Sequence, residues 1–126
     1  MEHKIYYHDT DSGGVVYYAN YLKYLEEART EFFEARGVPV PAFLARGFLF
    51  AVRSCNVVYK APARYGDVIC SDAVISRQTA AQIMFKQRVW DKATDKTLVE
   101  AEVALVCLNR DFKPEPLPAD VRERVA

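Results

Sequence analysis

The chain has 126 residues, of which 51% are hydrophobic and 27% charged, a composition typical of one globular domain with a buried core. Its 17 Lys and Arg residues balance 17 Asp and Glu residues, which argues against a general nucleic-acid-binding surface. No apolar run approaches the roughly 20 residues of a membrane span, and the N-terminus lacks the apolar segment of a signal peptide. We therefore expect a single cytoplasmic domain over residues 1–126, with no membrane span and no nucleic-acid partner.

The first predicted element is a strand from Lys4 to Thr10, because its start is rich in aromatic and β-branched residues. Two acids, Asp9 and Asp11, close this run. The pair Gly13-Gly14 then allows the backbone to turn sharply and to approach a ligand closely. Asp11 is thus expected at a strand end, one tight turn before a helix begins.

That helix is predicted from about Asn20 to Arg36, with Asn20 as N-cap and Gly37 as the residue that ends it. The prolines of Val38-Pro39-Val40-Pro41 prevent its continuation, and a short helical turn is expected over Ala42–Arg46. Apolar residues at helical spacing form one stripe, and further apolar residues beside it indicate a helix enclosed by a sheet. The stripe comprises Tyr21, Leu25, Ala28, Phe32 and Ala35.

Apolar and polar residues then alternate with a period of two, which predicts four long strands. These are Phe48–Tyr59, Asp67–Thr79, Ala81–Asp91 and Thr97–Asn109, followed by a tail with a short helix from Pro118 to Val125. Short connections imply antiparallel neighbours. The order predicts an α+β domain in which a five-stranded antiparallel sheet wraps one long central helix. Pairing of two copies at a sheet edge would cover an exposed edge.

The three cysteines are widely spaced and odd in number, and no Cys or His pair has the spacing of zinc ligands. We therefore predict no metal. Each cysteine falls in a predicted strand and is expected to be reduced, buried and space-filling. These residues are Cys55, Cys70 and Cys107.

Asp11 is the strongest candidate for chemistry. A carboxylate beside the free N–H groups of a helix N-terminus can act as general base or nucleophile, while those amides hold a developing oxyanion. The alternative role for Asp11 is that of a turn or capping residue. For Asp9 a structural hydrogen-bonding role is expected. Tyr7 either lines the site or packs in the core, and His8 is expected to face the opposite side of the strand.

Two other readings of the acidic stretch fit poorly. An EF-hand calcium loop would need an oxygen ligand where Gly13 stands and a glutamate where Asn20 stands. A phosphatase with a carboxylate nucleophile would need a larger, parallel α/β sheet.

The run Tyr7-x-Asp9-Thr10-Asp11-x-x-Gly14-Val15-Val16-Tyr17-x-Ala19-Asn20-Tyr21, with Glu26-x-Ala28-Arg29 after it, resembles the signature of hotdog-fold acyl-CoA thioesterases. It is most similar to the 4-hydroxybenzoyl-CoA thioesterase-like proteins, in particular the YbgC subgroup associated with the Tol-Pal system. The resemblance covers nearly the whole chain. It implies the hotdog fold, homodimers joined edge to edge or homotetramers, and active sites at the dimer interface.

The resemblance places the catalytic carboxylate on Asp11 and polarisation of the thioester carbonyl on the backbone N–H near Tyr18. Gly14 and Tyr7 are the further candidates for contact with the substrate. Many YbgC-like sequences have His where this chain has Tyr18, so a role of that imidazole does not carry over, whereas the backbone role does.

The expected activity is hydrolysis of an acyl- or aroyl-CoA, with no cofactor, since a thiolate is a good leaving group. Coenzyme A carries phosphates, for which Lys60 and Arg64 in a basic loop are the candidates. Arg77, Lys86 and Arg88 are weaker ones. The alternative function is a non-catalytic hotdog module that binds acyl groups, acyl carrier protein or an envelope-associated partner. A hotdog dehydratase is less favoured, because no suitably placed His accompanies the acid.

Overall fold

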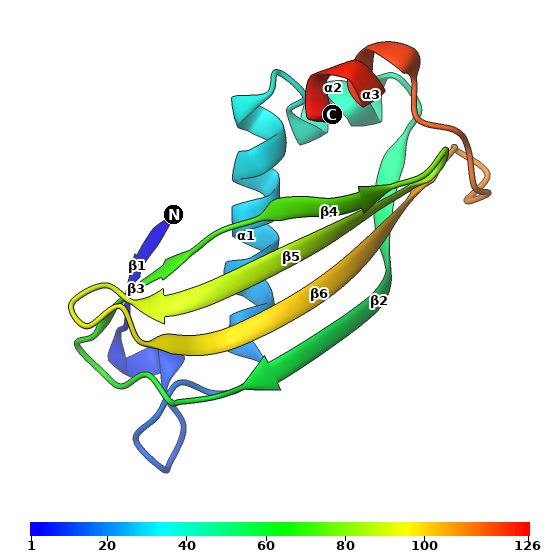
Figure 1. The fold of residues 1–126 in the computed structure, drawn as a ribbon. Coiled ribbons are helices and arrows are strands. Elements are labelled where there is room, and N and C mark those ends of the chain that lie inside the picture. The colour runs from blue at the N-terminus through cyan, green and yellow to red at the C-terminus, as the bar shows by residue number, and fades with distance from the viewer.

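A computed structural model describes residues 1–126, in which a six-stranded sheet lies against one long helix, α1 (Asn20–Ala35) (Figure 1). All strand pairs are antiparallel, in the order β1-β3-β5-β6-β2, with β4 also paired to β5. The strands are β1 (Glu2–Lys4), β2 (Leu49–Tyr59), β3 (Val68–Ser71), β4 (Val74–Gln78), β5 (Gln82–Asp91) and β6 (Thr97–Leu108). A 3₁₀ turn (Tyr7–Asp9) and the short helices α2 (Val40–Ala45) and α3 (Ala119–Val125) complete the chain. The α+β class is confirmed.

The sheet has six strands where the sequence predicted five, because the expected strand Asp67–Thr79 is interrupted after Ser71. Both of its parts, β3 and β4, pair with β5, and the register of β3 continues in β4 as far as Ile75, where a bulge shifts it by one residue. At the interruption, the Asp72 N–H donates to the Arg88 carbonyl (3.1 Å), and Asp72 Oδ1 accepts from the Arg88 N–H (2.8 Å). A side-chain oxygen thus replaces one bond of the backbone ladder at this point.

The predicted strand Lys4–Thr10 is wrong over most of its length. β1 ends at Lys4, and the 3₁₀ turn follows. Asp9 causes the change: its Oδ2 accepts from the Tyr6 N–H (2.8 Å), while its own N–H donates to the Tyr6 carbonyl (3.0 Å). Such local bonds compete with a sheet ladder. The expected alternation of faces therefore does not hold, and Tyr7 and His8 are both exposed.

The core lies between α1 and the inner face of the sheet. Phe85 of β5 is fully buried, and its ring meets those of Phe32 and Phe33 edge to face at 5.1 and 5.8 Å between centroids. The predicted helix stripe is buried except for Ala35, which is exposed near the helix end. β6 alternates as its sequence predicted, with five buried residues on one face: Val99, Ala101, Val103, Leu105 and Cys107.

Helix α1 differs from its prediction by one residue at each end, because it ends at Ala35 and its N-cap is Ala19. Gly37 takes a positive φ of 74° after the last turn, a conformation that favours glycine. At the start, Ala19 is the N-cap and Asn20 is the first helical residue. The Asn20 side chain instead donates to the Asp9 carbonyl (2.9 Å), which ties the helix start to the 3₁₀ turn.

β2 is an edge strand of the sheet, with one side unpaired. This corrects one expectation, because Cys55 of β2 is exposed whereas Cys70 and Cys107 are buried. Burial raises the pKa of the Cys107 thiol to about 11.

No helix of the structure is both long and apolar enough to cross a membrane.

Candidate active site

Asp11 lies in a tight loop that we call the Asp11 hairpin, residues 10–16. Thr10 and Val16 pair across its base, and the Asp11 N–H donates to the Val15 carbonyl (2.9 Å). Gly14 turns the loop with a φ of 79°, which a side chain would oppose. Asp11 Oδ1 accepts from the Gly13 N–H (2.8 Å), while Oδ2 has no partner in the chain. The exposed carboxylate thus fills the alternative role of a turn residue and at the same time keeps one oxygen free.

The hairpin is anchored on both sides. The Val16 N–H donates to the Ala63 carbonyl (2.8 Å), and Val15 forms an antiparallel bridge with Arg64. The Tyr17 N–H donates to the Asp9 carbonyl (3.0 Å). Asp9 therefore has the structural hydrogen-bonding role that was expected of it, and it holds the base of the hairpin against the start of α1.

Two backbone amides at the start of α1 are free and fixed in direction. The N–H groups of Tyr18 and Ala19 donate no hydrogen bond within the chain, as is usual for a helix N-terminus. Their peptide planes are held by the opposite carbonyls: the Tyr17 carbonyl accepts from the Asn20 N–H (2.9 Å), and the Tyr18 carbonyl accepts from the Tyr59 hydroxyl (3.1 Å). Such preorganised donors can stabilise negative charge on an oxygen.

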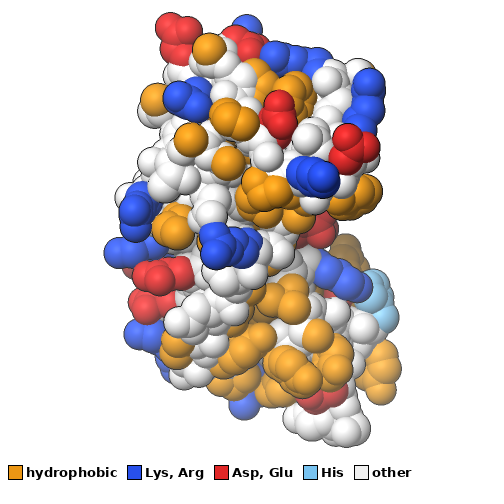
Figure 2. Space-filling view, turned by 90° about the vertical axis from the view of Figure 1, so that its right-hand side faces the viewer, with side chains coloured by type: hydrophobic (Ala, Val, Ile, Leu, Met, Phe, Trp, Pro, Cys, Tyr) orange, Lys and Arg blue, Asp and Glu red, His pale blue; other side chains and the backbone are white.

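The hairpin and these amides lie at the same end of the molecule, where β2 also ends (Figure 1). Tyrosine side chains surround this end: Tyr18 meets Tyr59 edge to face at 6.1 Å, and Tyr7 meets Tyr65 at 6.4 Å. Tyr7 is 81% exposed, so it belongs to this surface and not to the core. Figure 2, seen from the β2 side, shows hydrophobic side chains gathered toward the same end.

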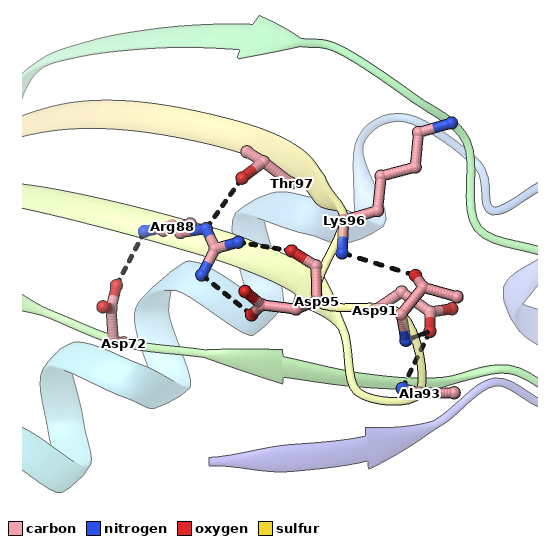
Figure 3. Close-up of polar contacts among 8 residues, drawn as sticks. Asp72, Arg88, Asp91, Ala93, Asp95, Lys96 and Thr97 are labelled. Carbon is pink, nitrogen blue, oxygen red and sulfur yellow. Dashed lines mark hydrogen bonds and ion pairs between the residues drawn. The ribbon is translucent and has the colours of Figure 1, made fainter.

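The basic residues that were predicted to bind the phosphates of coenzyme A differ in their surroundings. Arg64 lies beside the hairpin through its bridge to Val15, and its side chain has no partner in the chain. Lys60 Nζ instead lies 3.2 Å from Glu100 Oε2. Arg88 is also engaged: it donates to Thr97 Oγ1 (2.8 Å) and to the carbonyl of Asp95 (2.7 Å), as Figure 3 shows. Only Arg64 therefore stands both free and next to Asp11.

A cavity of about 560 Å³ opens between α1, α2 and β2. Its wall is mostly apolar, and its main polar groups come from three residues of α1 that lie within about one turn of each other: Glu26, Arg29 and Thr30. Arg29 was missed as a candidate, although its position four residues after Leu25 places it on the buried side of the helix. It is only 8% exposed, and burial lowers the pKa of its guanidinium.

Comparison with known proteins gives consistent results. The thioesterase-like superfamily matches residues 6–125. The chain is 38% identical over 119 residues to the acyl-CoA thioester hydrolase YbgC of Escherichia coli O6:H1, covering 94% of this chain and 88% of the relative. It is 32% identical over 120 residues to the acyl-CoA thioesterase YbgC of Haemophilus influenzae, with the same coverage of 94% and 88%.

Among solved structures, a variant of 4-hydroxybenzoyl-CoA thioesterase in complex with 4-hydroxybenzoyl-CoA superimposes with a TM-score of 0.91. The match covers 100% of this chain and 96% of that one, at 24% sequence identity. At this level of identity the likeness concerns the fold, and it confirms the hotdog architecture.

Proposed function

The chain belongs to the thioesterase-like superfamily, and from this membership we propose that it hydrolyses an acyl- or aroyl-CoA to the free acid and coenzyme A. One observation of the site carries the proposal: the Asp11 hairpin and the start of α1 lie at the same end of the molecule, and they supply a carboxylate oxygen and two backbone amides that are free of partners in the chain. Together they provide a base or nucleophile and a place for an oxyanion, the two things that acyl transfer needs.

In the proposed reaction the thioester carbonyl oxygen accepts hydrogen bonds from the free amides, which stabilise the negative charge that develops on it. Asp11 either removes a proton from the attacking water or attacks the carbonyl itself to give a mixed anhydride that water then cleaves. In both routes the carbon–sulfur bond breaks, one water is consumed, and the thiolate leaves as coenzyme A.

The surroundings suggest roles for the neighbouring residues. Gly14 allows the hairpin to turn, and Tyr7 stands on the exposed surface where the coenzyme would arrive. Arg64 is the better placed candidate for a coenzyme A phosphate, whereas Lys60 would first have to leave Glu100. The Tyr18 side chain takes no part in the chemistry, because the contribution proposed for this residue comes from its backbone.

We propose that two copies pair through the free edge of β2, which would complete the hydrogen bonding of that strand. The cavity beside α1 adjoins this edge, since four of its lining residues belong to β2. An apolar acyl group is a suitable occupant for a cavity of this size. Two dimers could pair again to give a homotetramer.

A thiol-release assay tests the function. The purified protein is offered short, long and aromatic CoA thioesters, and one acyl group on acyl carrier protein, while a colorimetric reagent detects the free thiol. Turnover well above the uncatalysed rate is expected for at least one CoA thioester. Tight binding of acyl-CoA without thiol release would contradict the proposal and support the alternative of a non-catalytic acyl-binding module. Thiol release only from the acyl group on acyl carrier protein would mean that the substrate is an acyl-acyl carrier protein and not an acyl-CoA.

A further inference from the structure

The cavity between α1 and β2 contains a buried cation that lacks an acidic partner. Arg29 is only 8% exposed, and its Nη1 donates one hydrogen bond, to Gln87 Oε1 (2.9 Å). Its other N–H groups donate none within the chain, and no carboxylate oxygen comes within 4.0 Å of its nitrogens. A guanidinium has five N–H donors, so most of its capacity is unused.

Gln87 fixes the direction of this guanidinium. Its Nε2 donates to the carbonyls of Leu25 (2.9 Å) and Asp72 (3.1 Å), which leaves Oε1 to hold Arg29 from the sheet side. The remaining donors of Arg29 therefore have the cavity as their free side, since Arg29 is one of the residues that line it.

An unpaired buried charge is unfavourable, and an acceptor that reaches it gains a strong hydrogen bond. The rest of the cavity wall is mainly apolar, with Leu22, Phe33 and Phe50 among its members. Its one acid, Glu26, is exposed and forms no ion pair with Arg29. The cavity thus combines a surface for an alkyl or aryl body with a single cationic donor. A molecule that fits both parts is apolar along its length and carries an oxygen acceptor at one place.

We propose that Arg29 selects acyl groups that carry an oxygen acceptor, best a carboxylate, toward the end remote from the thioester. The proposal rests on the thioesterase activity proposed above, and it narrows the substrate class. Arg29 follows Tyr18 by 11 residues, which corresponds to about 16 Å along α1. Because helical side chains lean toward the N-terminus, the guanidinium lies somewhat nearer than that. This separation matches a medium-length or long chain better than a single benzoyl ring.

The probes are two non-hydrolysable thioethers, S-dodecyl-coenzyme A and the same compound with a terminal carboxylate, measured by titration calorimetry. The wild-type protein is expected to bind the carboxylate form about tenfold to hundredfold more tightly, the value of a charge-assisted hydrogen bond in a buried site. Arg29→Met keeps most of the side-chain volume and should lose this preference. Arg36→Met removes an exposed arginine from the end of the same helix, outside the cavity, and should keep it.

Equal affinity of the wild-type protein for the two thioethers overturns the proposal, and this comparison needs no variant to fold. Retention of the preference by a folded Arg29→Met protein overturns it as well. If the preference is absent and Arg29→Met dissociates the oligomer in gel filtration, the guanidinium pairs with a second copy of the chain instead. Because the thioethers are not turned over, failure of the thiol-release assay and failure of this proposal are separate results.

Discussion

Gln87→Leu is the substitution for which the structure gives the clearest expectation. Gln87 is 4% exposed, and its side chain makes three hydrogen bonds between the sheet, helix α1 and the residue that follows β3. Leucine is close in volume, so packing changes little. What the substitution removes is the one acceptor of the buried Arg29 guanidinium, together with two donors to backbone carbonyls.

The magnitude follows from these bonds. The bond from Arg29 involves a charged group, a class worth about 1.5–3 kcal/mol, and the two neutral ones contribute about 1 kcal/mol each. We therefore expect the free energy of unfolding to fall by about 4 kcal/mol. For a chain of this length each kcal/mol lowers the melting temperature by about 3–4 °C, so a fall of about 12–16 °C is expected.

Urea unfolding monitored by the single tryptophan, Trp90, measures the change. The matched control is the double variant Arg29→Met with Gln87→Leu, which removes both partners. It should be more stable than Gln87→Leu by about 2 kcal/mol or more, because no buried charge is left without an acceptor. A loss below about 1 kcal/mol for Gln87→Leu, or simple additivity in the double variant, would refute this reading of the buried pair.

Three further predictions follow. Phe85→Ala should lower the free energy of unfolding by about 3–5 kcal/mol in the same urea assay, since it empties the ring site at the centre of the core; a loss under about 1 kcal/mol would contradict that placement. Tyr59→Phe should lower kcat several-fold with KM nearly unchanged, because the hydroxyl fixes the peptide that carries the Ala19 N–H; equal kcat values would remove this positioning role. The pKa of Cys107 is raised to about 11 in the folded chain, so the contribution of this thiol to the free energy of unfolding is fully present below about pH 8.5 and is lost as the pH rises toward 11. The reason is that in this range only the unfolded chain readily releases the thiol proton. Cys107→Ala should therefore reduce the slope of melting temperature against pH in that range.

Much of the fold was predictable because its signals are local and repeated. The alternation of β6 from Val99 to Cys107 fixes its face, and every apolar member of that face is buried. Helix α1 was predictable from its stripe and from Gly37, because glycine favours the positive φ that follows the last turn.

The errors arise where side chains or tertiary contacts override local preference. Tyr6 and Tyr7 favour a strand, yet the Asp9 carboxylate captures the Tyr6 N–H and forms a 3₁₀ turn. Cys55 was predicted to be buried because it lies in a strand, but it is exposed, and its strand β2 is at the edge of the sheet. The spacing of Arg29 from Leu25 places it on the buried side of α1, but its partner Gln87 lies 58 residues away and could not be read from that spacing.

For the site, the sequence named candidate residues but not how they are arranged. It indicated Asp11 and the amide of Tyr18 as candidates, and the Asp11 hairpin and the start of α1 lie at one end of the molecule. It could not separate Lys60 from Arg64, because the ion pair of Lys60 with Glu100 depends on the pairing of β2 with β6.

The most direct test of the account is kcat of Asp11→Asn for the best CoA thioester of the wild-type protein. Asparagine keeps the side-chain oxygen that accepts from the Gly13 N–H, so the hairpin should persist, whereas the base or nucleophile is lost. Asp111→Asn is the control, since it makes the same change at an exposed aspartate in the turn after β6. We predict that kcat falls by about 10²–10⁴-fold for Asp11→Asn and stays unchanged for the control. A folded Asp11→Asn protein with the kcat of the wild type would contradict the assignment of the chemistry to Asp11.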